Sequence, residues 1–136
     1  MASEPKATLT DIYDAWLAHD LDWLASYLPA DFSHSLNIPT ETLSLSGKRN
    51  GKLAAINRLK EIFDNYDTQH LEPKELVLHG DKAIAEVTAC CRHRASGLWL
   101  STTKRNVWRL EDGWPVELLE FYDLDQFDDF LKKAQG

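Results

Sequence analysis

The chain has 136 residues, which suits a single domain over residues 1–136 with its own hydrophobic core. Its formal net charge of −7 at pH 7 argues against a nucleic-acid-binding protein or one held on anionic membranes, since both depend on excess Lys and Arg. The sequence contains no long apolar run that could span a membrane and no signal-peptide pattern, so it predicts a cytoplasmic protein.

Three helices are expected in the first half of the chain. After a loose lead-in over residues 1–7, a helix is expected from Thr8, because apolar residues follow at helical spacing and Asp11 completes a capping box. Asp20 can cap a second, shorter helix. A third amphipathic helix follows Gly51.

The remaining elements are predicted to be β-strands. A short strand over residues 30–38 carries His34 on its apolar face, and a polar loop is expected over residues 39–50. A final helix is expected from Asp125. Together the elements predict an α+β fold in which the helices pack on one concave face of an antiparallel sheet. Four successive runs form the meander of this sheet, at residues 75–79, 82–94, 98–111 and 114–123.

The turn Ala95-Ser96-Gly97 sets the expected register of the central hairpin. A three-residue loop would place Glu86 opposite Asn106 and Thr88 opposite Lys104. One face of the hairpin then carries Ile84, Glu86, Thr88, Lys104, Asn106 and Trp108, and the other carries Ala85, Val87, Ala89, Cys91, Trp99 and Val107.

The cysteines and histidines do not suggest a metal site. Cys90 and Cys91 are adjacent in a predicted strand, so they point to opposite faces and are expected to be reduced. Neither belongs to a CxxC motif, and the histidines lack the spacing of metal ligands.

Several short motifs occur in an order that resembles a known family. They are Ala-Asp-Phe after the first two helices, Ser-Gly-Lys-x-x-Gly before the third, His-Gly-Asp-Lys-Ala at the start of a strand, Trp-Arg-Leu-Glu-Asp-Gly at a hairpin and Glu-Phe-Tyr-Asp near the end of the last strand. From about Thr8 to Phe130 the chain resembles the nuclear transport factor 2-like superfamily. Within it, the chain is most similar to the SnoaL-like branch, named for a polyketide cyclase and related to steroid delta-isomerase.

The resemblance implies a cone-shaped fold, in which a curved antiparallel sheet wraps around three N-terminal helices and a C-terminal helix follows. It also implies an apolar pocket at the open end and a homodimer formed through the outer face of the sheet. The expected pocket lining is Trp16, Leu36, Glu86, Trp108 and Phe121. An alternative for Glu86 is a surface salt bridge with Lys104.

Three residues are candidates for catalysis by this resemblance. Asn106 lies where steroid-isomerase-like proteins carry an oxyanion-hole donor, although it could equally be a buried Asn satisfied by its neighbours. The family's carboxylate base is expected at position 36, where this chain has Leu. His34, two residues earlier, is therefore the nearest replacement for the base; the alternative is that His34 is a core histidine. Asp123 matches the general acid/base that ends the last strand of SnoaL-like cyclases, or it caps the C-terminal helix.

Two functions fit these residues. The first is an isomerase or cyclase that needs no cofactor and abstracts a proton next to the carbonyl group of a hydrophobic small molecule. The second is a non-catalytic homodimeric module that binds a ligand or serves in assembly. The Leu in place of a base at position 36, and the Asn in place of an acid at position 106, favour the second function.

Overall fold

The structure, a computed structural model, describes residues 5–37, 47–122 and 133 of the chain. Its helices are α1 (Pro5–Leu17), α2 (Leu21–Tyr27) and α3 (Lys52–Asn65), and its strands are β1 (Ser33–Asn37), β2 (Gly47–Asn50), β3 (Tyr66–His79), β4 (Lys82–His93), β5 (Trp99–Glu111) and β6 (Trp114–Phe121). Within these residues, no helix has the length and apolar character needed to cross a membrane.

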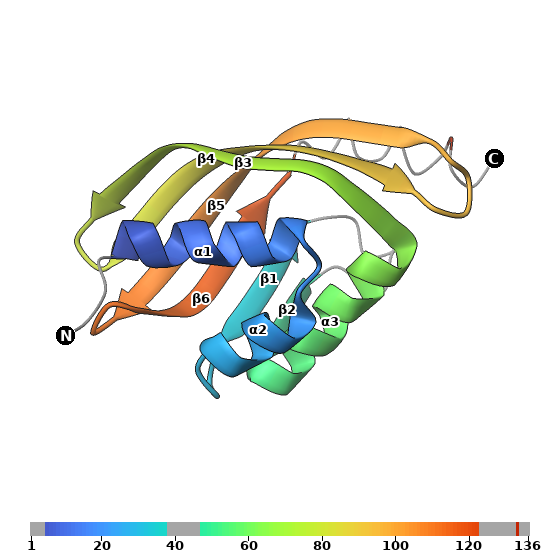
Figure 1. The fold of residues 1–136 in the computed structure, drawn as a ribbon. Helices are drawn as coiled ribbons and strands as arrows, with labels where there is room; N and C mark the ends of the chain where they lie inside the picture. The colour runs from blue at the N-terminus through green and yellow to red at the C-terminus, as the bar shows by residue number, and fades with distance from the viewer. Residues whose placement is uncertain (1–4, 38–46, 123–132, 134–136) are drawn as a thin grey trace.

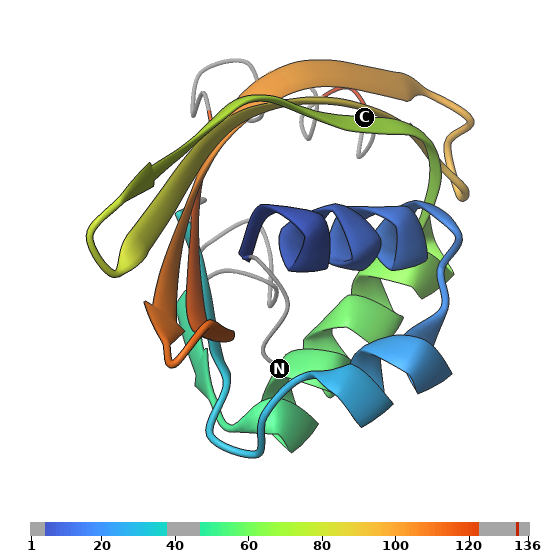
Figure 2. The same ribbon diagram turned by 60° about the vertical axis from the view of Figure 1, so that its left-hand side comes forward.

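The strands form one sheet in the order β2-β1-β6-β5-β4-β3. The predicted meander from β3 to β6 is confirmed, but β1 pairs with β6 in parallel, so the sheet as a whole is mixed. Figures 1 and 2 show the sheet curving around α1, with α2 and α3 closing the same concave side. The predicted α+β fold with a curved sheet around the helices is thus confirmed. The helix predicted from Asp125 lies outside the described residues.

The helix ends follow local chemistry. α1 begins at Pro5 rather than at Thr8, so the predicted lead-in was too long and the capping box with Asp11 was wrong. Proline suits the first turn of a helix because its fixed φ is helical and its missing N–H would have no partner there. The predicted cap of α2 is confirmed, since Asp20 Oδ1 accepts a hydrogen bond of 3.0 Å from the backbone N–H of Trp23.

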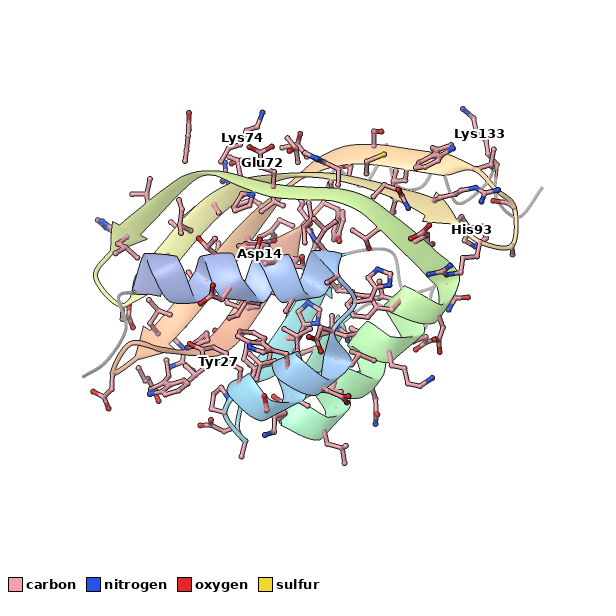
Figure 3. All side chains as sticks on the ribbon, viewed as in Figure 1. Asp14, Tyr27, Glu72, Lys74, His93 and Lys133 are labelled. Carbon is pink, nitrogen blue, oxygen red and sulfur yellow. The ribbon has the colours of Figure 1, made fainter. Side chains whose placement is uncertain are left out.

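The two edge strands were not predicted correctly. β3 begins at Tyr66 instead of residue 75, and β2 lies inside the stretch predicted as a loop. Both strands are paired on one side in the sheet order, so they can carry polar residues that hide the alternation. β3 also has register shifts near positions 69 and 75–76. Glu72 and Lys74 of β3 point away from the helices (Figure 3).

The register of the central hairpin also differs from the prediction. The loop has four residues, Arg94–Gly97, and the N–H of His93 bonds to the carbonyl oxygen of Leu98 at 2.8 Å. A shift of one residue exchanges the faces of one strand relative to the other. Glu86 therefore lies opposite Arg105 on the outer face, and the predicted grouping of Glu86 with Asn106 was wrong. The inner face of the hairpin carries Ala83, Ala85, Val87, Lys104, Asn106 and Trp108.

The hydrophobic core lies between the helices and this inner face. Trp108 is almost fully buried, and its ring meets that of Tyr13 edge to face at 5.8 Å between centroids. The hydroxyl oxygen of Tyr13 accepts hydrogen bonds from the indole N–H of Trp108 at 3.0 Å and from Asn106 at 2.7 Å. These bonds fix α1 against β5, and α1 in turn forms one wall of the pocket.

Candidate ligand pocket

A cavity of about 70 Å³ is lined by residues of the sheet and by Trp16 near the C-terminal end of α1. It is smaller than the roughly 150 Å³ engineered cavity that binds benzene, so its enclosed part suits one end of a ligand rather than a whole aromatic molecule. Strand alternation brings side chains of β3, β4 and β5 to it. Its lining is Trp16, Leu36, Ile62, Tyr66, Thr68, Leu71, Ala89, Cys91, Leu100, Thr102, Lys104 and Tyr122.

A buried cluster of charged residues adjoins the apolar lining. Glu120 of β6 is 1% exposed, and its two carboxylate oxygens have different partners. Oε1 forms an ion pair with Lys104 Nζ at 2.6 Å, and Oε2 lies 2.6 Å from His34 Nε2. Lys104 Nζ also donates to the Tyr122 hydroxyl at 3.3 Å and lies 5.1 Å from the centre of the Trp16 ring. Lys104 therefore connects the buried carboxylate to the wall of the pocket.

The protonation states of this cluster follow from its contacts. Burial alone would raise the pKa of Glu120, but the Lys104 ammonium and the hydrogen bond from His34 outweigh burial and lower it to about 2. Burial opposes the charge of Lys104 as well, yet Glu120 raises the pKa of Lys104 above its usual range. Both groups are therefore charged at neutral pH.

His34 is neutral in the same cluster. It is 1% exposed, and burial lowers its pKa more than Glu120 raises it. Because a carboxylate can only accept, the neutral ring carries its proton on Nε2 and donates it to Glu120. The other ring nitrogen, Nδ1, is buried and has no hydrogen-bond partner among the described residues. His34 is thus held in one tautomer.

Two of the five residues predicted to line the pocket do so, namely Trp16 and Leu36. Trp108 instead lies in the core beneath α1. Glu86 points to the outer face, where its carboxylate pairs with Arg105 at 3.0 Å. Phe121 is 43% exposed, because alternation along β6 turns it away from its buried neighbour at position 120.

The two predicted catalytic residues that the structure describes, His34 and Asn106, do not line the pocket. His34 does not occur in the described lining, since it lies behind the carboxylate of Glu120. Asn106 Nδ2 donates to Tyr13 in the core, whereas its Oδ1 is buried without a hydrogen-bond partner among the described residues, so the alternative of a satisfied buried Asn holds only for the donor side. Asp123 lies outside the described residues. The catalytic roles of all three stay predictions.

Sequence reasoning missed Glu120 and did not include Lys104 among the predicted site residues. A signal for Glu120 was present, because Val116, Leu118 and Glu120 share one face of β6 by alternation, and the first two are apolar. Lys104 likewise shares a face with Trp108, four residues further along β5.

Comparisons with known proteins agree with this architecture. A family model of the SnoaL-like domain matches residues 9–118. The structure of TerC co-crystallised with polyporic acid aligns with a TM-score of 0.83 and 17% identity, covering 96% of this chain and 99% of that one. An NTF2-like protein of unknown function from Burkholderia pseudomallei aligns with a TM-score of 0.82 and 20% identity, covering 95% and 98%.

An epoxide hydrolase of the LEH-like type from M. tuberculosis aligns with a TM-score of 0.76 and 13% identity, covering 98% of this chain and 93% of that one. At such identities the structural neighbours show a common fold. A search of curated proteins found no significant match. The predicted resemblance is confirmed by the family model, which spans most of the sequence, and the chain belongs to the SnoaL-like domain family.

Proposed function

We propose that the chain binds a small hydrophobic molecule in the pocket and holds a carbonyl or acidic oxygen of that molecule against Lys104. The observation that carries this proposal is a lysine ammonium group, 4% exposed, in the wall of a largely apolar cavity. Ligand pockets commonly combine an apolar lining with a few fixed polar groups that orient the ligand. The ion pair with Glu120 and the bond to Tyr122 fix the ammonium in place.

The geometry leaves Lys104 able to contact a ligand. An ammonium group has three N–H donors, and the contacts of Lys104 with Glu120 and Tyr122 involve two of them. We therefore propose that a further N–H of Lys104 donates to a ligand oxygen in the cavity. Because this donor is charged and shielded from water, its attraction for an oxygen that carries negative charge is stronger than at the surface.

This arrangement also favours proton-transfer chemistry, as in an isomerase or a cyclase. When a base removes a proton from the carbon next to a carbonyl group, negative charge develops on the carbonyl oxygen. Lys104 would stabilise that charge, which is the role predicted for Asn106. Asp123, which follows Tyr122 directly in the chain, remains the predicted base. The family membership and the epoxide hydrolase neighbour support an enzymatic role of this kind for the fold.

Binding is tested with 4-phenylbutan-2-one, a neutral ketone, and 3-phenylpropionate, a carboxylate of nearly the same shape. The test variant is Lys104→Met with Glu120→Gln, which removes both buried charges together. Its matched control is Lys60→Met with Asp64→Asn, which removes an exposed ion pair of 2.8 Å on α3. We expect the wild type and the control to bind, and the test variant to lose about tenfold or more in affinity for the carboxylate. Unchanged affinity in the test variant would contradict the proposal.

Catalysis is tested by hydrogen exchange at the carbons next to the carbonyl group of 4-phenylbutan-2-one in D₂O, followed by ¹H NMR. Exchange faster than in buffer, and lost in the Lys104 and Glu120 variant, would support enolate stabilisation. Removing one such donor typically lowers the rate by about 10²–10³-fold. Binding without exchange would support the non-catalytic ligand-binding module instead.

We further propose that the chain forms a homodimer through the outer face of the sheet. On this face Phe121 is 43% exposed, and it lies beside the partly exposed Val107 in a shallow groove. Apolar side chains on an exposed sheet face favour association. Analytical ultracentrifugation of the variant Phe121→Glu tests the interface, with Leu53→Glu on α3, 76% exposed, as the matched control. A dimer that survives Phe121→Glu would exclude this face.

A further inference from the structure

We infer that the pocket takes its ligand as an anion, and that binding of the anion is coupled to uptake of one proton by His34. The inference rests on the proposed function, because the anion occupies the ligand position at Lys104. It adds the chemical class of the ligand, a hydrophobic acid, and the group that balances its charge.

A continuous series of contacts runs from the pocket to His34. Lys104 faces the cavity, Glu120 lies 2.6 Å from its ammonium group, and His34 Nε2 lies 2.6 Å from the other oxygen of the same carboxylate. All three side chains are at least nine-tenths buried. A charge added beside Lys104 is therefore poorly screened by solvent at His34.

An anion bound at Lys104 would upset the charge balance of the buried cluster. Glu120 already neutralises Lys104, so an anion bound at Lys104 adds a second negative charge next to one buried ammonium. An uncompensated buried charge is strongly unfavourable. A proton from solvent can restore the balance either on Glu120 or on His34. Glu120 resists protonation, because its carboxylate is held by contacts with both Lys104 and His34.

His34 can accept the proton without losing its existing bond. Nδ1 carries a lone pair in the tautomer that donates from Nε2, and no described residue bonds to it. Protonation forms one N–H bond at Nδ1 and gives an imidazolium paired with the Glu120 carboxylate, while the ligand remains an intact anion. A cavity of about 10 Å³ adjoins His34, and its other lining residues are aliphatic or aromatic.

Burial, and to a lesser extent nearby cations, keep His34 neutral until the anion binds. Arg58 of α3 donates to the backbone oxygen of His34 at 3.3 Å, and Arg49 of β2 lies opposite His34 in the strand register. Lys104 of β5 is the third cation, while α1 presents the uncharged ring of Trp16. Burial opposes a positive charge on His34 most strongly, and Arg58 and Lys104 add to this effect. A ligand anion offsets the cations, so the pKa of His34 rises on binding.

The experiment follows the ¹⁵N signals of the His34 ring by NMR during titration with 3-phenylpropionate or 4-phenylbutan-2-one. The titration is kept above the pKa of 3-phenylpropionate, so its carboxylate stays ionised and any proton taken up goes to the protein. At a separation of roughly 8 Å, one added charge should raise the titration midpoint of His34 by about one pH unit or more. We expect this shift with the carboxylate and none with the ketone. The exposed His70 and His79 serve as internal controls.

Calorimetry gives an independent count of protons. The heat of 3-phenylpropionate binding, measured near the midpoint in two buffers that differ in ionisation enthalpy, should reveal net uptake of up to one proton per ligand, and His34→Gln should abolish it. If this variant does not fold, the ring signals of the wild type decide the question alone.

The outcomes separate the inference from the function on which it rests. A carboxylate that binds while His34 stays neutral overturns the inference and leaves the proposed function intact. An equal His34 shift with the ketone also overturns it, because the coupling would then not depend on ligand charge. If neither probe binds, the proposed function fails and the inference fails with it.

Discussion

Replacing Lys104 by Met should destabilise the protein far more than replacing a surface lysine. The substitution keeps most of the side-chain volume but leaves the Glu120 carboxylate buried with His34 as its remaining close partner. Breaking a buried ion pair by removing one partner typically costs about 3–5 kcal/mol. The pKa of Glu120 gives a consistent magnitude, since its fall from 4.5 to about 2 corresponds to about 3 kcal/mol of stabilisation of the charged form.

The assay is urea unfolding at pH 7 of matched lysine variants. Lys60→Met is the control, because Lys60 also forms an ion pair at 2.8 Å, with Asp64, but both side chains are more than half exposed. The control should change the free energy of unfolding by at most about 1 kcal/mol. Adding Glu120→Gln to Lys104→Met should restore most of the lost stability, because no buried charge then lacks a partner.

The pH dependence of the wild type provides a second readout. The folded pKa of Glu120 lies below its unfolded value, so its contribution is complete above about pH 4.5 and is lost as the pH falls toward 2. Glu120→Gln should therefore flatten the loss of stability in this window. If Lys104→Met costs no more than Lys60→Met, the ammonium is hydrated, and the description of the pocket as a shielded site is wrong.

Three further predictions concern other parts of the chain. Asp20→Ala should lower the free energy of unfolding by about 1 kcal/mol through loss of the α2 cap, whereas Asp22→Ala, in the first turn, should cost less; equal losses would argue against the cap. Gly51→Ala should cost about 1–3 kcal/mol, because the backbone there has φ 87° and ψ 151°, and a neutral effect would contradict that conformation. Cys91, whose pKa burial raises to about 11, should react with a thiol reagent at pH 8 more slowly than Cys90, as measured on the two single Cys-to-Ala variants; equal rates would place both thiols in similar surroundings.

The parts of the fold that depend on local chemistry were predictable from the sequence. The Asp20 cap and the apolar stripe of α3 involve residues a few positions apart, and both occur in the structure. The strands of the central meander alternate clearly, because one face of each is buried in the core. Helix existence and the order of the meander strands β3 to β6 required no knowledge of distant contacts.

The pocket depended on details that a single sequence specifies poorly. The loop Arg94–Gly97 has one residue more than predicted, which shifts the register of β4 against β5 by one position. Glu86 therefore faces away from the pocket, and it forms a salt bridge with Arg105 instead of the predicted one with Lys104. Turn residues indicate where a hairpin bends, but three- and four-residue loops draw on the same residue types. The choice between them decides which side chains face the ligand.

Strand β6 shows a second ambiguity. Leu118 and Leu119 are adjacent, so apolar character alone allows either to point into the core. The structure buries Leu118 and with it Glu120, two residues later, which turns Phe121 outward. Choosing a glutamate over a phenylalanine for the interior requires knowing that Lys104 lies within reach, and that contact joins two strands. The partner of a buried charge is a tertiary fact.

Stability gives little reason for the buried pair of Lys104 and Glu120. Replacing such a pair with uncharged groups of similar volume is often neutral or stabilising, because the cost of removing two charges from water disappears. The variant that carries both Lys104→Met and Glu120→Gln should therefore fold about as well as the wild type. A folded variant that no longer binds 3-phenylpropionate would show that the charges serve the ligand, whereas one that binds it equally well would assign them to packing alone.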